Sequence, residues 1–454
     1  MKLTIAGGGG FRVPQVLDVL SRHDSVFQIT DVTLYDVSTM RMGVIENVIH
    51  GLYSDRPDLP NITTTTDLGE AVEGADFVFS AMRVGGTDGR VRDERVALEN
   101  RIIGQETIGP GGQAYALRTL PEAMRLAEAV RDRAPGAWVI NFTNPAGIIT
   151  QAMRTVLGRR VIGICDTPIG LMRKACAAID VDPADVDFDY VGLNHLGWLR
   201  SLEVDGEDRL PQIIASDDLL DRIEEARILG FDWVRALGML PNEYLFYYYY
   251  GRESVARIVE SKQTRGEFLR DQQARFYEDA ARSPEDAARL WEEAHGEREA
   301  TYMAESRAEE DRAGRRTEDL GGGYQEVAFS IMKAIVRGEP ATMILNVANE
   351  DGPDGLLVPG LSAEAVVEVP CTVDGSGVHP HKVAPLTGPE FGLVSTVKAA
   401  EERLLDAYFN ADADAAWQAM AAHPLVDSIS VARDILNGYL ADESLQQVLG
   451  TNEA

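Results

Sequence analysis

The stretch Lys2–Leu20, KLTIAGGGGFRVPQVLDVL, decides the fold class, because a short apolar run ends in four glycines and passes into a helical pattern. Apolar residues recur at helical spacing from Val13 to Leu20, and Pro14 suits the first turn of a helix. A strand, a glycine turn and a helix in this order place backbone N–H groups and a positive helix end where a pyrophosphate can bind. The stretch therefore predicts the first unit of a nucleotide-binding α/β fold.

An acidic residue follows at the expected place. Asp36 ends the next apolar run, where a carboxylate can accept both ribose hydroxyls of NAD. Arg41 follows five residues later, so NADP remains an alternative to NAD. A plain tight turn remains an alternative to dinucleotide binding, because glycine runs also occur in such turns. The glycines match the dinucleotide fingerprint imperfectly, since Arg12 stands where a third glycine is usual. The predicted NAD contacts are Gly7, Gly8, Gly9, Gly10, Phe11, Arg12 and Asp36.

Further apolar runs alternate with helical patterns in the first part of the chain. Strands are expected at residues 2–6, 31–35, 77–81, 138–142 and 161–164, and residues 120–134 carry one apolar face of a helix. This alternation predicts βαβ units and a doubly wound, Rossmann-like parallel sheet of the lactate and malate dehydrogenase kind.

The pattern changes after about residue 190. Residues 198–204 followed by Asp205-Gly206 predict a strand and a hairpin, residues 218–340 are mostly helical, and Ser283–Asp286 is a helix start. Residues 341–400 suggest strands and loops, and the chain from Val397 is helical again. We therefore expect an NAD-binding domain over residues 1–190. A mixed, largely helical α+β domain for substrate binding and oligomerisation should follow over residues 191–454.

Composition excludes several classes of partner. The 454 residues carry a net charge of −30, which disfavours nucleic acid and anionic membranes. No apolar run approaches a membrane span, no signal-peptide pattern opens the chain, and three cysteines favour a reducing compartment. The sequence thus predicts a cytoplasmic protein, and an anionic substrate would require a local cluster of arginines.

One cysteine and one histidine stand out by position. Cys165 ends a predicted parallel strand, and ligand sites of open α/β sheets lie at these ends. His195, thirty residues on, occupies another strand-to-loop junction, and a thiolate and an imidazole together can hold a divalent metal. Two alternatives remain open on spacing alone: buried structural residues, or a Cys-His nucleophilic dyad.

The segment 267–318 is dense in Glu, Asp and Arg. Charge runs of this kind are typical of a solvated helical face, and we interpret the segment in that way rather than as a binding surface.

A series of ordered motifs extends over almost the whole chain. Together they resemble family 4 of the glycoside hydrolases, the NAD- and divalent-metal-dependent enzymes that act mainly on 6-phospho-glucosides, and within it the 6-phospho-β-glucosidases. The motifs are GGGGFRVP (Gly7–Pro14), RVGGTDGRVRDE (Arg83–Glu94), GQETIGPGG (Gly104–Gly112), NFTNP (Asn141–Pro145), CDTP (Cys165–Pro168), GLNH (Gly192–His195) and PNEYLFYYYY (Pro241–Tyr250).

The resemblance implies a reaction and a set of roles. NAD⁺ would take a hydride from C3 of the sugar, and a metal, expected to be Mn²⁺, would be held by Cys165 and His195. Tyr244 would then remove the C2 proton, the leaving group would depart from C1, water would add and the hydride would return. Arg265 would supply a positive charge near Tyr244, because a phenol has an ordinary pKa near 10. Asp166 completes the implied catalytic set.

The resemblance also implies how the substrate is held. Asn144 matches a substrate-binding asparagine, and Arg83 and Arg90 are candidates for the sugar 6-phosphate, since guanidinium forks suit phosphate oxygens. Glu106 and Asn194 are assigned supporting contacts. The chain departs from the family pattern at Gly10, Arg12 and Val13, where Ser, an aromatic residue and Thr are usual.

Several functions stay open at this point. Asp166 is more usual in the phospho-α-glucosidases, whereas the runs around it are more similar to those of the β group, so a 6-phospho-α-glucosidase is one alternative. An NAD-dependent 2-hydroxy acid dehydrogenase is another, because NFTNP is similar to the Asn-Pro turn of those enzymes. A phosphorylated disaccharide or glucoside is the expected partner, and the resemblance suggests a homodimer or homotetramer.

Overall fold

A single mixed sheet organises the computed structural model, which describes residues 1–21, 29–56, 59–261, 263–302 and 323–451. Its strand order is β10-β8-β7-β12-β11-β6-β5-β4-β1-β2-β3, with β13 paired to β12 and β9 paired to β8. The strands are β1 (Lys2–Ala6), β2 (Asp31–Tyr35), β3 (Asn61–Thr65), β4 (Phe77–Ser80), β5 (Trp138–Asn141), β6 (Val161–Gly163), β7 (Val186–Leu193), β8 (Leu196–Val204), β9 (Glu207–Asp208), β10 (Leu240–Pro241), β11 (Ala341–Ala348), β12 (Val366–Asp374) and β13 (Gly377–Pro380).

Helices cover this sheet and extend from it. The α-helices up to residue 229 are α1 (Val13–Ser21), α2 (Thr39–Tyr53), α3 (Leu68–Val72), α4 (Gly86–Glu99), α5 (Gly109–Arg133), α6 (Ala146–Leu157), α7 (Thr167–Ala178), α8 (Leu210–Ala215), α9 (Asp217–Leu220) and α10 (Glu224–Leu229). The later ones are α11 (Phe231–Leu237), α12 (Leu245–Tyr249), α13 (Gly251–Glu260), α14 (Arg265–Arg282), α15 (Ala287–Ala300), α16 (Tyr324–Arg337), α17 (Gly388–Asn410), α18 (Ala413–Ala422), α19 (Ile429–Tyr439) and α20 (Glu443–Val448). Short 3₁₀ turns are η1 (Gly158–Arg160), η2 (Pro183–Asp185), η3 (Pro284–Asp286) and η6 (Asn349–Asp351).

The N-terminal part of the sheet has the expected doubly wound order. Strands β3, β2, β1, β4, β5 and β6 are all parallel, which confirms the Rossmann-like prediction. Strands β1 and β2 begin and end as predicted, whereas β4, β5 and β6 each end one residue earlier than expected. They end together because the pairing stops along one row, Ala6–Ser80–Asn141–Gly163, where the chain turns into loops.

Successive residues of these strands serve two cores. Phe77 and Phe79 belong to one hydrophobic cluster and Val78 to the other, since neighbouring side chains of a strand point to opposite faces. A sheet buried on both faces explains the continuous apolar runs that made these strands recognisable. β3 was not predicted, because its sequence, NITTT, is a polar strand at the edge of the sheet.

Two strands from the C-terminal part of the chain complete the sheet. β11 and β12 pair antiparallel with each other and lie between β6 and β7. Their pairing extends the row of strand ends from Gly163 through Asn346 and Glu368 to Gly192. Because β7 crosses residue 190, the sheet is continuous there, and the division into domains 1–190 and 191–454 stays a prediction.

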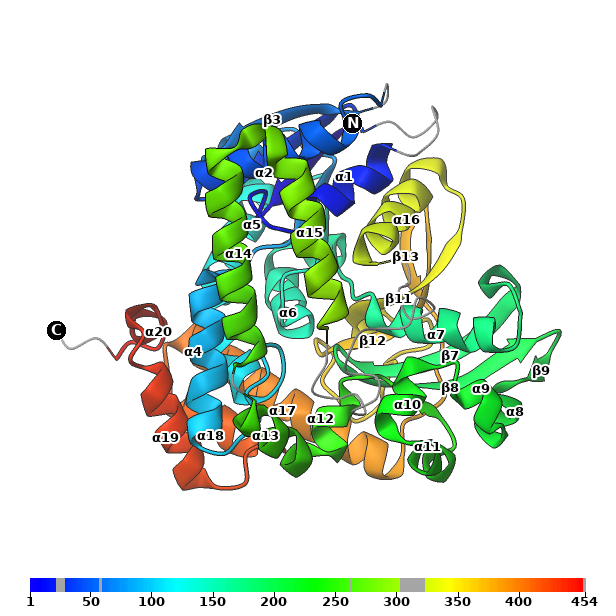
Figure 1. Cartoon of the computed structure of the whole chain (residues 1–454). Helices are drawn as coiled ribbons and strands as arrows, with labels where there is room; N and C mark the ends of the chain where they lie inside the picture. The colour runs from blue at the N-terminus through cyan, green and yellow to red at the C-terminus, as the bar shows by residue number, and fades with distance from the viewer. Residues whose placement is uncertain (22–28, 57–58, 262, 303–322, 452–454) are drawn as a thin grey trace.

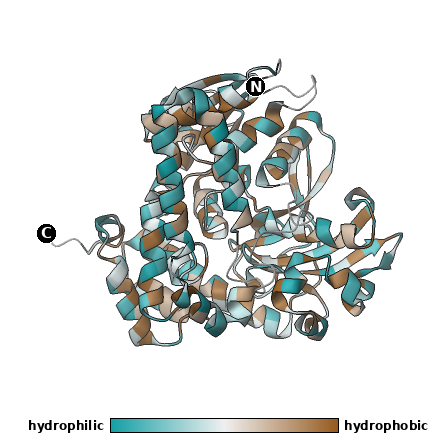
Figure 2. Ribbon diagram, in the orientation of Figure 1, coloured by the Kyte–Doolittle hydropathy of each residue, from teal (hydrophilic) through white to brown (hydrophobic). Residues whose placement is uncertain are grey.

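A long helical pair flanks the sheet. α14 and α15 pack against each other, α14 also contacts α4, and α15 also contacts α2, as the lime ribbons in Figure 1 show. The start predicted at Ser283–Asp286 appears as η3, which leads into α15. Teal residues prevail along α14 and α15 in Figure 2, in agreement with a largely solvated charged face. Among the residues described, no helix combines the length and apolarity that crossing a membrane requires.

Candidate active site

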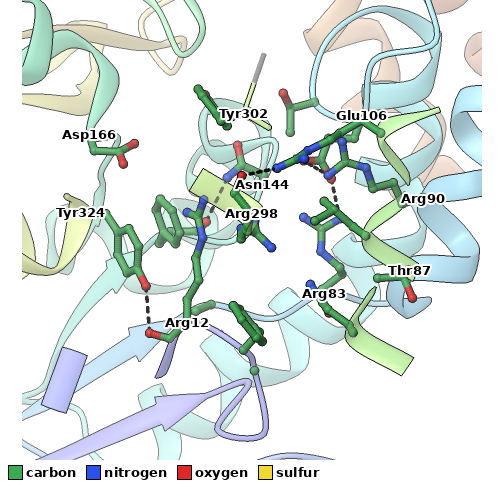
Figure 3. Close-up of a pocket in the computed structure, with 18 of the residues that line it drawn as sticks. Arg12, Arg83, Thr87, Arg90, Glu106, Asn144, Asp166, Arg298, Tyr302 and Tyr324 are labelled. Carbon is green, nitrogen blue, oxygen red and sulfur yellow. Dashed lines mark hydrogen bonds and ion pairs between the residues drawn. The ribbon is translucent and has the colours of Figure 1, made fainter. Parts of the chain in front are cut away.

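A cavity of about 1540 Å³ lies beyond the carboxyl ends of the parallel strands. Loops after β1, β2, β4, β5 and β6 form one wall, and α12, α14 and α15 contribute the other. Figure 3 shows side chains from both walls pointing toward each other. Of the residues predicted for the site, the cavity is lined by Gly7, Gly9, Gly10, Phe11, Arg12, Asp36, Arg83, Arg90, Glu106, Asn144, Cys165, Asp166, His195, Tyr244 and Arg265.

The glycine loop leaves room for a dinucleotide. Gly7 has φ +92°, and a Cβ there would lie 2.6 Å from the carbonyl oxygen of Ala81. Gly8 turns away from the cavity, since its N–H donates to the Tyr35 carbonyl oxygen at 2.7 Å and a Cβ would meet Leu34. The Asp36 carboxylate accepts the N–H of Gly9 at 3.1 Å and that of Ser38 at 3.0 Å. The loop and the carboxylate thus form a backbone cradle that fits NAD.

Three aromatic side chains from distant helices hold this loop. Tyr277 donates to the carbonyl oxygen of Gly9 at 2.7 Å, and the indole N–H of Trp291 donates to that of Phe11 at 2.8 Å. Tyr324 donates to the carbonyl oxygen of Arg12 at 3.0 Å, which Figure 3 also shows. These donors were not predicted, because α14, α15 and α16 reach the loop only through the tertiary fold. They explain how an atypical glycine loop keeps a defined conformation.

Cys165 and His195 line the same cavity and are only 4% exposed each. The Cys165 Sγ lies 4.0 Å from Asp166 Oδ1, and burial together with that carboxylate raises the pKa of the thiol well above its usual value. The His195 Nδ1 lies 2.9 Å from Thr107 Oγ1, so that Nε2 is the ring nitrogen left to bind a ligand. Burial lowers the pKa of His195 to about 3, which keeps the imidazole neutral.

This donor set fits a catalytic metal better than a structural one. A bound cation stabilises the thiolate that burial disfavours, and a neutral imidazole is the form that binds metals. Among the residues described, no group of three or more His, Cys, Asp and Glu side chains could hold a metal. Two protein ligands leave positions open for substrate oxygens or water, as catalytic metal sites require.

Tyr244 stacks on His195, with ring centroids 3.7 Å apart and planes 7° from parallel. Its hydroxyl lies 3.3 Å from that of Tyr302, which donates to Glu243 Oε1 at 2.8 Å. Burial and the neighbouring Glu243 and Cys165 raise the pKa of Tyr244 well above its usual value. The phenol therefore sits beside the candidate metal ligand, where a bound cation would oppose that increase.

Arg265 also lines the cavity, where it contacts residues of α14 and the end of α15. Its guanidinium donates to Thr301 Oγ1 and, at 2.9 Å, to the carbonyl oxygen of Arg298, and it lies over the Phe268 ring. Tyr302 rather than Arg265 is the recorded hydrogen-bond partner of the Tyr244 hydroxyl. The charge-supplying role of Arg265 stays a prediction.

Arg83 and Arg90 share one carboxylate, Glu106, with nitrogen–oxygen distances of 2.6 Å each. Arg90 also pairs with Glu94 at 2.7 Å. Although burial opposes it, these two guanidinium groups lower the pKa of Glu106 to about 2. Arg90 is 8% exposed and pairs with two carboxylates, whereas the Arg83 side chain is 35% exposed and pairs with one, so Arg83 has the freer guanidinium for an incoming anion.

Arg298, on α15, is the cation that the sequence interpretation missed. It points into the cavity in Figure 3, and no carboxylate lies within ion-pair distance among the residues described. Burial and the nearby guanidinium groups of Arg12, Arg265, Arg83 and Arg90 lower its pKa well below the usual value. The guanidinium lies over the Phe11 ring, 5.9 Å from its centroid, and an incoming anion would offset the repulsion among these cations.

The interpretation of residues 267–318 as a purely solvated face is thus wrong for the inner side of α15. His295, Arg298 and Glu299 line the cavity, while Arg289 and Glu293 on the same helix pair at the surface. One side of α15 faces the cavity and the other faces solvent, and the composition of the segment does not distinguish the residues on the two sides. Residues 303–318 of that segment lie outside the described residues.

The two asparagines behave differently. Asn144 lines the cavity and donates to the Phe142 carbonyl oxygen at 3.1 Å, and its Oδ1 has no hydrogen-bond partner among the described residues. An acceptor without a partner at this place suits a sugar hydroxyl. Asn194 lies outside the cavity lining, and its Nδ2 is 3.5 Å from Glu368 Oε1. Its predicted substrate contact therefore lacks support from the geometry.

Comparisons with known proteins agree with this geometry. Residues 2–181 match the model of the "Family 4 glycosyl hydrolase", and residues 190–426 match that of the "Family 4 glycosyl hydrolase C-terminal domain". A probable 6-phospho-β-glucosidase of Bacillus subtilis is 27% identical over 97% of this chain and 96% of its own. A 6-phospho-α-glucosidase of Lacticaseibacillus paracasei is 28% identical over 95% of both. A crystal structure of a 6-phospho-α-glucosidase from gut microorganisms, in complex with NAD and Mn²⁺, superimposes with a TM-score of 0.78 at 26% identity over 97% of both chains.

Proposed function

The chain belongs to family 4 of the glycosyl hydrolases, and from that premise we propose that it is an NAD- and metal-dependent 6-phospho-β-glucosidase. One observation carries the proposal. A single cavity contains the glycine loop with Asp36, the Cys165–His195 pair, the phenol of Tyr244 and the guanidinium of Arg298, which has no carboxylate partner within the described part of the chain. A glycosidase that works with two carboxylates needs neither a nucleotide-binding loop nor a Cys-His metal site.

The cofactors follow from the residues and from one relative. The glycine loop and Asp36 would hold NAD, and Cys165 and His195 would hold a divalent ion, with Mn²⁺ as the expected one because a relative's crystal structure contains it. When bound, the two groups would supply a hydride acceptor and stabilisation of negative charge at C3 of the sugar.

The protein's own side chains divide the remaining work. Tyr244 takes the C2 proton, after which the leaving group departs from C1 and water adds there. Arg298 and Arg83 bind the 6-phosphate, which meets the requirement for local positive charge in a protein of net charge −30. Asn144 Oδ1 accepts a hydrogen bond from a sugar hydroxyl.

The configuration at C1 is the finer part of the proposal. The runs TPIG, GLNHLGW and PNEYLFYYYY support the β anomer, as does the Bacillus subtilis relative. Asp166 and the two α-specific relatives support a 6-phospho-α-glucosidase instead, which is the second candidate. Elimination after C2 deprotonation tolerates either anomer, so the comparison must be made with matched substrates.

The test is hydrolysis of p-nitrophenyl β-glucoside 6-phosphate by the purified protein with NAD⁺ and Mn²⁺ under reducing conditions. We expect release of nitrophenol without accumulation of NADH, and solvent deuterium at C2 of the product. The α anomer and the unphosphorylated β-glucoside are the matched controls. Faster release from the α anomer would replace the first candidate by the second. NADH formed in proportion to an oxidised 2-hydroxy acid, without nitrophenol release, would instead identify a dehydrogenase.

We also propose that the enzyme works in the cytoplasm as a homodimer or homotetramer. All three cysteines are free and buried, which suits a reducing compartment. Light scattering of the purified protein tests the assembly, and a monomer would refute that part.

A further inference from the structure

A carboxyl group outside the cavity is linked by hydrogen bonds to the segments that carry His195 and Tyr244. Glu368, on β12, is fully buried, and no Lys or Arg pairs with it among the described residues. Its Oε1 accepts the side-chain N–H of Asn346 at 2.9 Å and that of Asn194 at 3.5 Å. Its Oε2 accepts the hydroxyl of Tyr190 at 3.3 Å. A buried acid with three donors and no cation has a role other than ion pairing.

The first branch of this network leads to His195. Asn194 immediately precedes it, and Glu368 pairs across the sheet with Gly192 in the strand that enters the same turn. His195 has φ +63°, a left-handed conformation that a residue with a side chain adopts only when its surroundings hold it. Backbone pairing and the Asn194 contact supply that constraint from one side of the turn, and Thr107 holds Nδ1 from the other.

The second branch leads to Tyr244. Tyr190 accepts the side-chain N–H of Asn242 at 3.4 Å, and Asn242 is fully buried. The Oδ1 of Asn242 accepts the backbone N–H of Tyr244 at 2.9 Å, and its own N–H donates to the Gly197 carbonyl oxygen at 2.9 Å. The segment that carries the phenol is therefore tied to the same carboxyl through two intermediate side chains.

We propose that Glu368 is a positioning residue whose buried carboxyl holds the Asn194–His195 turn and, through Tyr190 and Asn242, the Tyr244 segment, so that the imidazole and the phenol stack in the cavity. The 3.7 Å stacking of these two rings is the geometry that both branches maintain. Burial raises the pKa of Glu368 to about 7, and the hydrogen bonds from Asn346, Asn194 and Tyr190 oppose that increase.

This inference deepens the proposed function. Of its two measurements, the one with Mn²⁺ rests on the proposed function and the one with metal-free protein does not. Residues that orient a metal ligand typically change metal affinity by about 10- to 100-fold when they are replaced. Glu368→Gln preserves the shape of the group but cannot accept hydrogen bonds at both of its terminal atoms. We therefore expect Mn²⁺ to bind about 10-fold more weakly to this variant, measured by the paramagnetic resonance of free Mn²⁺ with NAD present.

A second measurement needs no metal. Protein labelled with ¹⁵N-histidine contains seven imidazoles, and the His195 signals are assigned by their loss in His195→Ala. In metal-free protein we expect these signals to shift or broaden in Glu368→Gln. Asn194→Ala, which removes one contact at a half-buried position, should shift them as well and provides the answer if Glu368→Gln does not fold.

The matched control is Asp93→Asn. Asp93 is equally buried and pairs with Arg118 at 2.6 Å, but it lies outside the cavity lining. This variant should lower the melting temperature and leave both the His195 signals and the Mn²⁺ affinity unchanged. If Glu368→Gln behaves like this control, Glu368 is only a structural residue and the inference is wrong. Where Glu368→Gln does not fold, the same conclusion follows from Asn194→Ala behaving like the control. Failure of the wild type to hydrolyse phospho-glucosides would refute the proposed function but not the metal-free result.

Discussion

Replacing Arg298 by Gln should make the protein more stable and a poorer enzyme. The half-buried guanidinium of Arg298 faces Arg12, Arg83, Arg90 and Arg265, which together with burial lower its pKa, and no carboxylate pairs with it among the described residues. Removing a half-buried cation that faces four other guanidinium groups relieves their repulsion and part of its own desolvation, and we expect about 1–3 kcal/mol of this to appear in the free energy of unfolding. For a chain of this length that raises the melting temperature by about 1–3 °C.

The effect on catalysis has the opposite sign. A guanidinium that grips a phosphate makes two charge-assisted hydrogen bonds, each contributing about 1.5–3 kcal/mol. Losing both should lower kcat/KM for the 6-phosphorylated substrate by about 10²- to 10⁴-fold. The ratio of kcat/KM for the phosphorylated and unphosphorylated glucosides should fall with it, because the unphosphorylated substrate never uses the contact.

Thermal unfolding with and without glucose 6-phosphate measures both effects on one sample. At 100 times its dissociation constant, the ligand should stabilise the wild type by about 2.7 kcal/mol and the variant by much less. Arg289→Gln is the matched control, since Arg289 lies on the same helix but pairs with Glu293 at the surface. A drop in melting temperature with an unchanged preference for the phosphorylated substrate would show that Arg298 is structural.

Three further variants test the rest of the site. Cys165→Ser should lose Mn²⁺ binding and activity while its circular dichroism spectrum stays that of the wild type; full activity would exclude Cys165 as a ligand. Tyr244→Phe should abolish deuterium incorporation at C2 and leave NAD affinity, measured by fluorescence quenching, within about 2-fold of the wild type, because the phenol acts on the sugar rather than on the dinucleotide. Glu106, whose pKa falls from 4.5 to about 2 beside Arg83 and Arg90, contributes about 3 kcal/mol of stability above pH 4.5 that is lost as the pH falls toward 2. Acid unfolding of Glu106→Gln should lack that part of the slope, and an unchanged acid limb would contradict the ion pairs.

Much of the fold followed from local patterns, and the exceptions have a physical cause. Continuous apolar runs between helical patterns predicted the buried parallel strands, and the bounds of these strands agree with the prediction to within one residue. β3 is an exposed edge strand of polar residues, so its sequence carries no burial signal. The antiparallel insertion of β11 and β12 between β6 and β7 depends on contacts between distant segments, which periodicity does not record.

The candidate site divides in the same way. Cys165 and His195 could be selected because each lies within two residues of a strand's end, and the fold brings such ends to one edge of the sheet. Tyr244 depended on resemblance alone, since its neighbours are aromatic. Arg298 could not be selected, because the sequence of its helix is typical of a charged surface until the packing shows which side faces the cavity, and Tyr302 follows that helix in the same charged segment.

The insertion of β11 and β12 also sets the order in which the protein can assemble during synthesis. β6 and β7 leave the ribosome close together, whereas the two strands that fill the space between them emerge only after residue 374 has been made. At about 5–20 residues per second, synthesis from the end of β7 to residue 374 takes about 9–36 seconds, and during that time the nascent chain has two unpaired strand edges, which are typical starting points for aggregation. Cys165 and His195 lie just after β6 and β7, so a metal ion held by this pair, as proposed above, would bind only once β11 and β12 have docked. We therefore expect cofactor loading to come late in the assembly of this enzyme, after the sheet has closed.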